Sequence, residues 1–155
     1  MAAYKPYCLI LIPILILLTA SFHVAYGGVD DSLLLSYKHV VIRNDLTSKD
    51  NLVVHCKSGD SDLGRVTIPY GGSWGFRFRV NLAHTTRFYC HFTWPGQSKW
   101  FDIFEVLRDD NIGGPWPICR ECVWSIDGDT FGGPCRIRRD GKPPFCFGWN
   151  PSKGF

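Results

Sequence analysis

Eight residues, SWGFRFRV at positions 73–80, decide the fold class of this chain. Apolar side chains occupy every second position, and glycine or arginine stands between them. A period of two places successive side chains on opposite faces of an extended strand. The apolar face carries Trp74, Phe76, Phe78 and Val80. The stretch is therefore predicted to be a half-buried antiparallel strand whose aromatic face contributes to the core.

The same period recurs on both sides of this stretch. Residues 87–93 place Phe88, Cys90 and Phe92 on one face. Residues 99–106 are expected to place a second aromatic group together, namely Trp100, Phe104 and Val106. Further strands are predicted at 38–43, 51–57, 65–70, 122–126, 130–137 and 145–149.

Turn sequences rich in glycine, proline and polar residues separate the predicted strands. Asp127-Gly128-Asp129 is expected to form a hairpin turn, and Arg108 to Ile118 an irregular loop. No stretch of ten or more residues shows the apolar stripe of a helix. The sequence therefore predicts an all-β fold, a small antiparallel β-sandwich of about eight short strands, stabilised by disulfides.

The N-terminal segment has the features of a secretory signal peptide. Lys5 supplies a positive charge, and residues 7–20 are almost wholly apolar. A bilayer-spanning helix needs about 20 apolar residues, so this run is too short for one. Small residues at Ala25 and Gly27 favour cleavage after Gly27, with cleavage after Ser21 as the alternative. We expect residues 28–155 to be one secreted, monomeric domain without stable membrane insertion.

Six cysteines remain after Cys8 leaves with the signal peptide, and an even number in a small exported chain predicts three disulfides. The residues alone do not choose the pairing. Cys119 and Cys122 form a C-x-x-C motif, which is found in redox sites and in zinc sites. The strand predicted after the motif, the lack of a second C-x-x-C and the export signal all favour structural disulfides.

No other constellation predicts catalysis, a metal or a cofactor. His55 and His91 adjoin cysteines but point to the opposite strand face, so neither forms a Cys–His nucleophile pair. Acid–base chemistry by two histidines stays open as an alternative. The paired aspartates in the loops lack the spacing of a calcium loop. The near-balanced composition, with a formal net charge of +3, gives no reason to expect a nucleic-acid partner.

One basic cluster stands near the C-terminus and comprises Arg136, Arg138, Arg139 and Lys142. It could approach an anionic membrane surface or an acidic wall polymer. An exposed hairpin flank is the interpretation we prefer, because Asp140 interrupts the cluster.

An ordered series of short motifs runs through the mature region. It comprises VIRNDL at 41–46, LVVHCKS at 52–58, DLG at 62–64, WGFRF at 74–78, TRFYC at 86–90, WFD at 100–102, CVW at 122–124 and CFGW at 146–149. In this order the motifs resemble the plant self-incompatibility S-protein family, also called S-protein homologues. The resemblance implies a secreted β-sandwich that acts as an extracellular signalling ligand for a cell-surface receptor. Founding members are stigma proteins that signal to incompatible pollen.

The resemblance also bears on the disulfides. The family's four cysteines match Cys56, Cys90, Cys122 and Cys146, which leaves Cys119 and Cys135 as an additional couple. On that basis we expect the pairs 119–135, 56–146 and 90–122.

Recognition residues are expected on loops that a rigid sheet holds in place. We expect receptor contacts from Asp60 and Asp62 in one loop and from Arg108, Asp109, Asp110 and Asn111 in another. Trp116, between two prolines, is either an aromatic anchor for a partner or a lid over the sandwich end.

Two other functions remain as alternatives to a non-enzymatic ligand. A secreted hydrolase or defence protein would use residues such as His91 or Asp109. A carbohydrate-binding module would use an exposed Trp94 or Trp116.

Overall fold

The computed structural model describes residues 37–128 and 132–151, and the predicted signal peptide lies outside them. The described residues form nine strands and one helical turn. The strands are β1 Tyr37–Asn44, β2 Leu52–Lys57, β3 Asp62–Ile68, β4 Ser73–Arg79, β5 Arg87–Trp94, β6 Gln97–Glu105, β7 Glu121–Ile126, β8 Cys135–Arg136 and β9 Phe145–Cys146. The helical turn is α3, Val106–Asp109. The predicted all-β class is confirmed.

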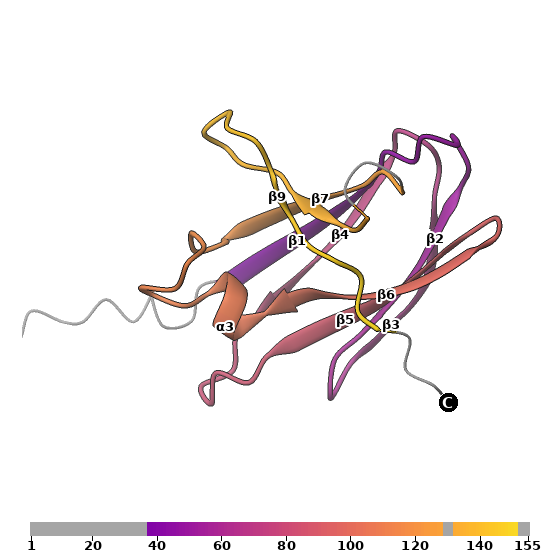
Figure 1. Cartoon of the computed structure of the whole chain (residues 1–155). Helices are drawn as coiled ribbons and strands as arrows, with labels where there is room; N and C mark the ends of the chain where they lie inside the picture. The colour runs from indigo at the N-terminus through magenta and orange to yellow at the C-terminus, as the bar shows by residue number, and fades with distance from the viewer. Residues whose placement is uncertain (1–36, 129–131, 152–155) are drawn as a thin grey trace, which may run out of the picture. The chain divides into compact units, whose positions relative to one another are not determined.

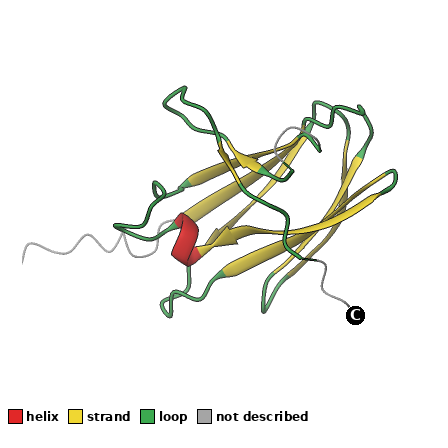
Figure 2. Ribbon diagram, in the orientation of Figure 1, coloured by secondary structure: helices red, strands yellow, loops and turns green. Residues whose placement is uncertain are grey.

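The strands form two facing sheets (Figures 1 and 2). One has the order β4-β1-β7-β8-β9 and the other the order β3-β2-β5-β6. The four-stranded sheet is antiparallel, as expected. The five-stranded sheet departs from expectation, because β7 runs parallel to β1. A parallel neighbour needs a crossover connection, and here the chain between β1 and β7 passes through the other sheet and α3.

Alternation along the central strands builds the core between the sheets. In β1 every second residue is buried, and β2, β5 and β7 follow the same pattern. The largest buried side chain is Trp124 of β7, whose ring lies 5.1 Å from that of Phe101 on β6. Burying a large apolar side chain stabilises a fold by roughly 1.5–3 kcal/mol, so these positions dominate the energetics of the sandwich.

The stretch 73–80 forms β4 and turns the predicted face inward. Trp74, Phe76 and Phe78 pack against the core, and the Phe78 ring lies 4.5 Å from that of Phe88 and 4.8 Å from that of Phe104. Their burial is only partial, because β4 is an edge strand of its sheet.

The predicted faces of β6 need correction. An irregularity in the pairing of β5 with β6 lies between Phe88 and Cys90 and shifts the register. As a result Phe101 and Ile103 join Phe104 in the core. Trp100, expected beside Phe104, instead lies on the outer face, where it stacks on His91 at 4.3 Å. A bulge has no clear signature in the alternation of a single strand.

The disulfides differ from all three expected pairs. The structure joins Cys56 to Cys90, Cys119 to Cys122 and Cys135 to Cys146. Cys56 and Cys90 are register partners on β2 and β5, and Cys135 and Cys146 are register partners on β8 and β9. Two of the pairs thus follow strand neighbours, which the sequence alone does not reveal, and the third joins the two cysteines of the C-x-x-C motif.

Two predicted strands are shorter than expected. The strand expected at 130–137 is reduced to Cys135–Arg136, and that at 145–149 to Phe145–Cys146. Beside these strands the chain packs closely at Gly133, where a Cβ atom would lie 2.0 Å from the Phe147 carbonyl oxygen. Asp129 of the predicted turn lies outside the described residues. No helix within 37–128 or 132–151 has the length and hydropathy to cross a bilayer.

Gly75 provides a test of how closely β4 and β1 pack. A Cβ atom there would lie 2.6 Å from the Val40 carbonyl oxygen, whereas one at Gly59 would meet nothing within 4 Å. We expect Gly75→Ala to lower the free energy of unfolding by about 1–3 kcal/mol, as overpacking does. Gly59→Ala should change it by less than about 0.5 kcal/mol. Equal effects of the two variants in urea unfolding would contradict this packing.

Candidate recognition loops

The predicted recognition residues lie at one end of the sandwich. The registers of β2 with β5 and of β5 with β6 place the 58–61 turn, the start of β5 and the end of β6 at the same end of the four-stranded sheet. The connection from β6 to β7, which carries the second predicted loop, leaves from that end. The β4–β5 loop, residues 80–86, also lies there.

Asp60 and Asp62 differ in how firmly they are held. Asp60 is exposed and accepts a hydrogen bond from the Ser58 hydroxyl at 2.8 Å. Asp62 lies 2.9 Å from the Lys57 ammonium and 2.6 Å from His55 Nε2. The Lys57 ammonium above all, then the Gly64 N–H and His55, hold the pKa of Asp62 well below its usual range. Asp62 is therefore an ionised anchor of this turn, and Asp60 is its freer carboxylate.

Asp109 is not a surface residue, although the sequence placed it in an exposed loop. Its side chain is fully buried. The carboxylate accepts hydrogen bonds from Arg136 Nη1 at 2.5 Å, from Arg108 Nη2 at 2.6 Å and from the Glu105 N–H at 3.0 Å. Burial lowers the pKa of Arg136 and the Asp109 charge opposes that shift. In this arrangement Asp109 is accessible neither to a receptor nor to a substrate.

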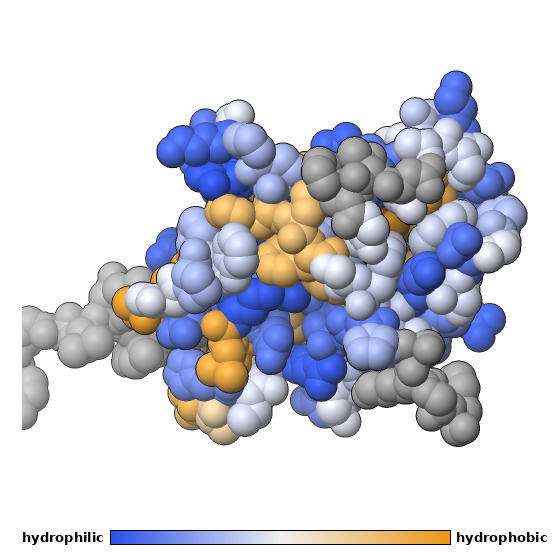
Figure 3. All heavy atoms as spheres, viewed as in Figure 1, coloured by the Kyte–Doolittle hydropathy of each residue, from blue (hydrophilic) through white to orange (hydrophobic). Residues whose placement is uncertain are grey.

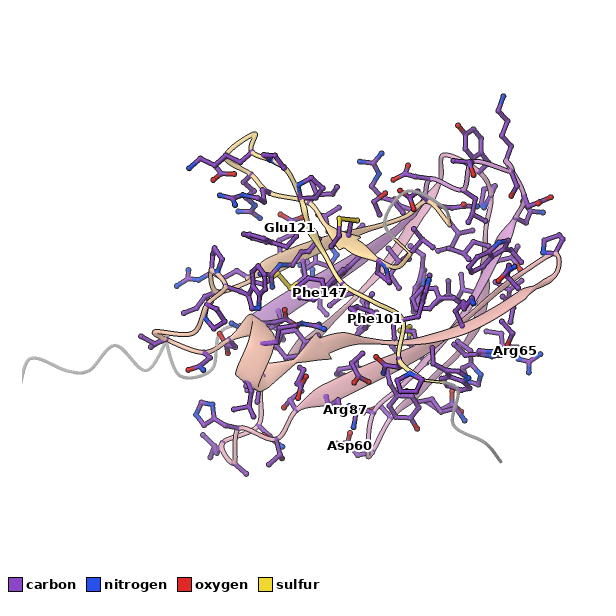
Figure 4. The ribbon with its side chains drawn as sticks, viewed as in Figure 1. Asp60, Arg65, Arg87, Phe101, Glu121 and Phe147 are labelled. Carbon is purple, nitrogen blue, oxygen red and sulfur yellow. A yellow bond between two sulfur atoms is a disulfide. The ribbon has the colours of Figure 1, made fainter. Side chains whose placement is uncertain are left out.

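Arg108 is likewise held inside. Its guanidinium lies 5.0 Å from the ring centroids of Phe101, Trp124 and Phe147, and Nη2 donates to the Asp102 carbonyl at 2.7 Å. Figure 4 shows Phe101 on β6 and Phe147 on the C-terminal segment that follows β9. A cation desolvated against several aromatic faces is held firmly, so Arg108 joins the two sheets.

Asp110 continues the same cluster, and beyond it the loop becomes exposed. Asp110 forms an ion pair with Lys38, whose side chain is almost fully buried. Asn111 is exposed, and 89% of the Ile112 surface is accessible. Arg108, Asp109 and Asp110 thus position the loop, whereas Asn111 and Ile112 form its surface.

Trp116 packs against the segment around β9. Its ring lies 4.8 Å from Phe145 and 5.4 Å from Phe147. Figure 3 shows an apolar patch over β9 on this face of the molecule. The contacts are those of a lid, and the partial exposure of Trp116 leaves part of its ring available to a partner.

Sequence reasoning missed the β4–β5 loop. Leu82 in it is 79% exposed, and the Asn81 side chain bonds the Thr85 N–H at 2.9 Å and the Thr85 hydroxyl at 2.8 Å. His84 has a positive φ of 52°, which is unusual for a residue other than glycine. The only available signal was the polar, turn-like stretch between two strands. The β4–β5 loop is therefore a third ordered loop at the end of the sandwich that carries the predicted recognition residues.

The basic cluster is largely neutralised. Arg136 is buried against Asp109, Arg138 pairs with Asp140, and Arg139 pairs with Glu121. The Arg138 guanidinium also lies 4.5 Å from the Phe145 ring centroid. These contacts favour the exposed hairpin flank over a free basic patch for membranes.

His55 and His91 lie far apart in the sequence but are direct neighbours on the outer face of the four-stranded sheet. His55 of β2 is the register partner of His91 of β5, with Arg65 and Trp100 on the flanking strands. His91 Nε2 lies 2.8 Å from the Ser98 hydroxyl. Burial first, then the charges of Arg65 and His55, lowers the pKa of His91. No group of three metal-ligating side chains occurs among the described residues.

The lowered pKa of His91 predicts a pH dependence. Because the unfolded chain binds this proton more tightly, His91 should contribute stability above about pH 6.5 that is lost as the pH falls through that region. An NMR titration should place the midpoint of His91 below the ordinary value. Arg65→Gln should raise it by removing one of the repelling charges, and Arg77→Gln, on the other sheet, should not. A midpoint in the wild type at or above the ordinary value would refute this.

Comparisons with known proteins give the family. Residues 39–149 match the family of plant self-incompatibility protein S1. S-protein homolog 3 of Arabidopsis thaliana is 45% identical over 115 residues, which cover 73% of either chain. S-protein homolog 20 of the same plant is 40% identical over 136 residues, covering 87% of this chain and 92% of that one.

A solved structure gives the fold independently. It matches with a TM-score of 0.52 at 20% identity, over 76% of this chain and 97% of that chain. That structure is of an SPH (Self-Incompatibility Protein Homologue) protein, from a widespread family of small, highly stable, secreted plant proteins. The resemblance in the ordered motifs is therefore confirmed: the chain belongs to the plant self-incompatibility protein S1 family.

Proposed function

We propose that this protein is a secreted signalling ligand that a cell-surface receptor recognises through the loops at the end described above, in pollen–stigma or related cell–cell signalling. Family membership supports the class of function, and the solved relative is described as secreted. The proposed role needs no turnover and no cofactor. One monomer would be sufficient to present the loops.

The observation that carries the proposal is the way the loops are held. Asp109, paired with Arg108 and Arg136, fixes the start of the β6–β7 connection, and the Cys119 N–H donates to the Asp109 carbonyl at 2.7 Å. A loop ordered before binding loses less conformational entropy when a partner engages it. We assign the contacts to Asp60, Asp62 and Asn111, with Ile112 and Trp116 as apolar contacts. Arg108, Asp109 and Asp110 act as positioning residues.

The proposal is tested by binding of the fluorescently labelled protein to plant protoplasts. We expect saturable binding that unlabelled protein displaces. The triple variant Asp60→Ala, Asn111→Ala, Ile112→Ser removes exposed side chains only, and it should weaken binding by about tenfold or more, as loss of central contacts does. These three substitutions should leave the melting temperature unchanged.

Tyr70→Ala is the matched control, since Tyr70 is 51% exposed and lies just after β3, at the opposite end of the sandwich. Its binding should equal that of the wild type. Wild-type affinity in the triple variant, or loss of affinity in Tyr70→Ala alone, would show that recognition lies elsewhere.

A further inference from the structure

A groove opens at the end of the sandwich opposite the recognition loops. Residues of the β1–β2 loop, the β5–β6 hairpin and the C-terminal segment, together with Gly128 and Gly132, surround a cavity of about 310 Å³ there. Its lining comprises Ser48, Asp50, Trp94, Pro95, Gln97, Lys99, Gly128, Gly132 and Trp149. This volume is at the lower limit of ligand pockets, which span roughly 300–1,000 Å³.

Two tryptophans form the apolar part of the groove. The rings of Trp94 and Trp149 lie 6.0 Å apart at an angle of 41°, and each remains partly exposed. Trp149 packs its edge against Phe92 in the core at 5.6 Å. The adjacent Asn150 N–H donates to the Trp100 carbonyl at 2.8 Å, which fixes this segment on β6. The two rings are therefore presented on a rigid support.

Three polar side chains of the groove are free to meet a ligand. Within residues 37–128 and 132–151, Asp50, Gln97 and Lys99 form no side-chain hydrogen bond or ion pair. Asp50 and Lys99 are nevertheless half-buried. Lys49, which precedes Asp50, has a positive φ of 59°. Such a backbone conformation is costly for a residue other than glycine and often marks a functional segment.

We infer that this groove binds a neutral pyranose unit of a glycan. The apolar C–H face of a pyranose packs on an aromatic ring, and its hydroxyls pair with a carboxylate, an amide and an ammonium, which together supply acceptors and donors. The negative charge of Asp50 and the positive charge of Lys99 cancel, so the groove favours an uncharged sugar over a uronate. The site lies at the opposite end from the receptor-binding loops and does not depend on them.

Calorimetry with the folded, oxidised protein tests the inference. The probes are cellohexaose and β-1,4-galactohexaose as neutral sugars and hexagalacturonate as the anionic one. We expect saturable binding of at least one neutral probe, with quenching of tryptophan fluorescence, and weaker binding of hexagalacturonate. No saturation by either neutral probe up to about 10 mM would overturn the site, since that is weaker than specific recognition requires. Tighter binding of hexagalacturonate would overturn its neutral specificity.

Variants locate the binding. Trp149→Ala should weaken binding by about tenfold or more. Because Trp149 also contacts the core, Gln97→Ala and Asp50→Asn serve as variants that leave the aromatic packing intact, and each should weaken binding several-fold. Trp100→Ala is the matched control, a tryptophan stacked on His91 outside the groove, and its affinity should be unchanged. Wild-type affinity in Gln97→Ala and Asp50→Asn together would overturn the assignment.

Discussion

The buried carboxylate of Asp109 is the constraint on which the end of the sandwich that carries the candidate recognition loops depends. A charge in an apolar interior is strongly unfavourable unless it is paired and hydrogen-bonded. Here Arg136 from β8 and Arg108 from α3 form ion pairs with the carboxylate. The backbone carbonyl of Asp109 also accepts a hydrogen bond from the Cys119 N–H. These contacts can form only if the β6–β7 connection returns over the end of the sandwich. The same return brings β7 alongside β1.

The interior of the sandwich was largely predictable from the sequence, because burial there follows the period of a strand. The inward faces of β4 and β5 appear directly in the alternation of residues 73–80 and 87–93. The errors concern relations between distant segments. The shifted register that sends Trp100 outward, the parallel pairing of β7 with β1 and the disulfides between register partners all depend on which strands become neighbours.

The candidate recognition loops show the same limit. A loop beginning at Arg108 was predictable, but Arg108 and Asp109 look like ordinary loop residues in the sequence and lie inside in the structure. Arg136, which stands 27 residues away, supplies the partner that makes this burial favourable. The two ends of the sandwich consequently differ. One carries loops fixed by buried ion pairs, and the other an open groove in which Asp50, Gln97 and Lys99 have no side-chain partner among the described residues.

A double-mutant cycle in urea unfolding, with Asp109→Asn, Arg136→Met and the combined variant, tests the central role of the buried pair. Asp109→Asn leaves the buried Arg136 without its counter-ion and should lower the free energy of unfolding by about 3–5 kcal/mol. Arg136→Met leaves Asp109 paired with Arg108 and should lower it by a smaller amount. The combined variant should lose clearly less than the sum, because it removes both members of the Asp109–Arg136 pair. Additive losses, or single losses below about 0.5 kcal/mol, would contradict the account.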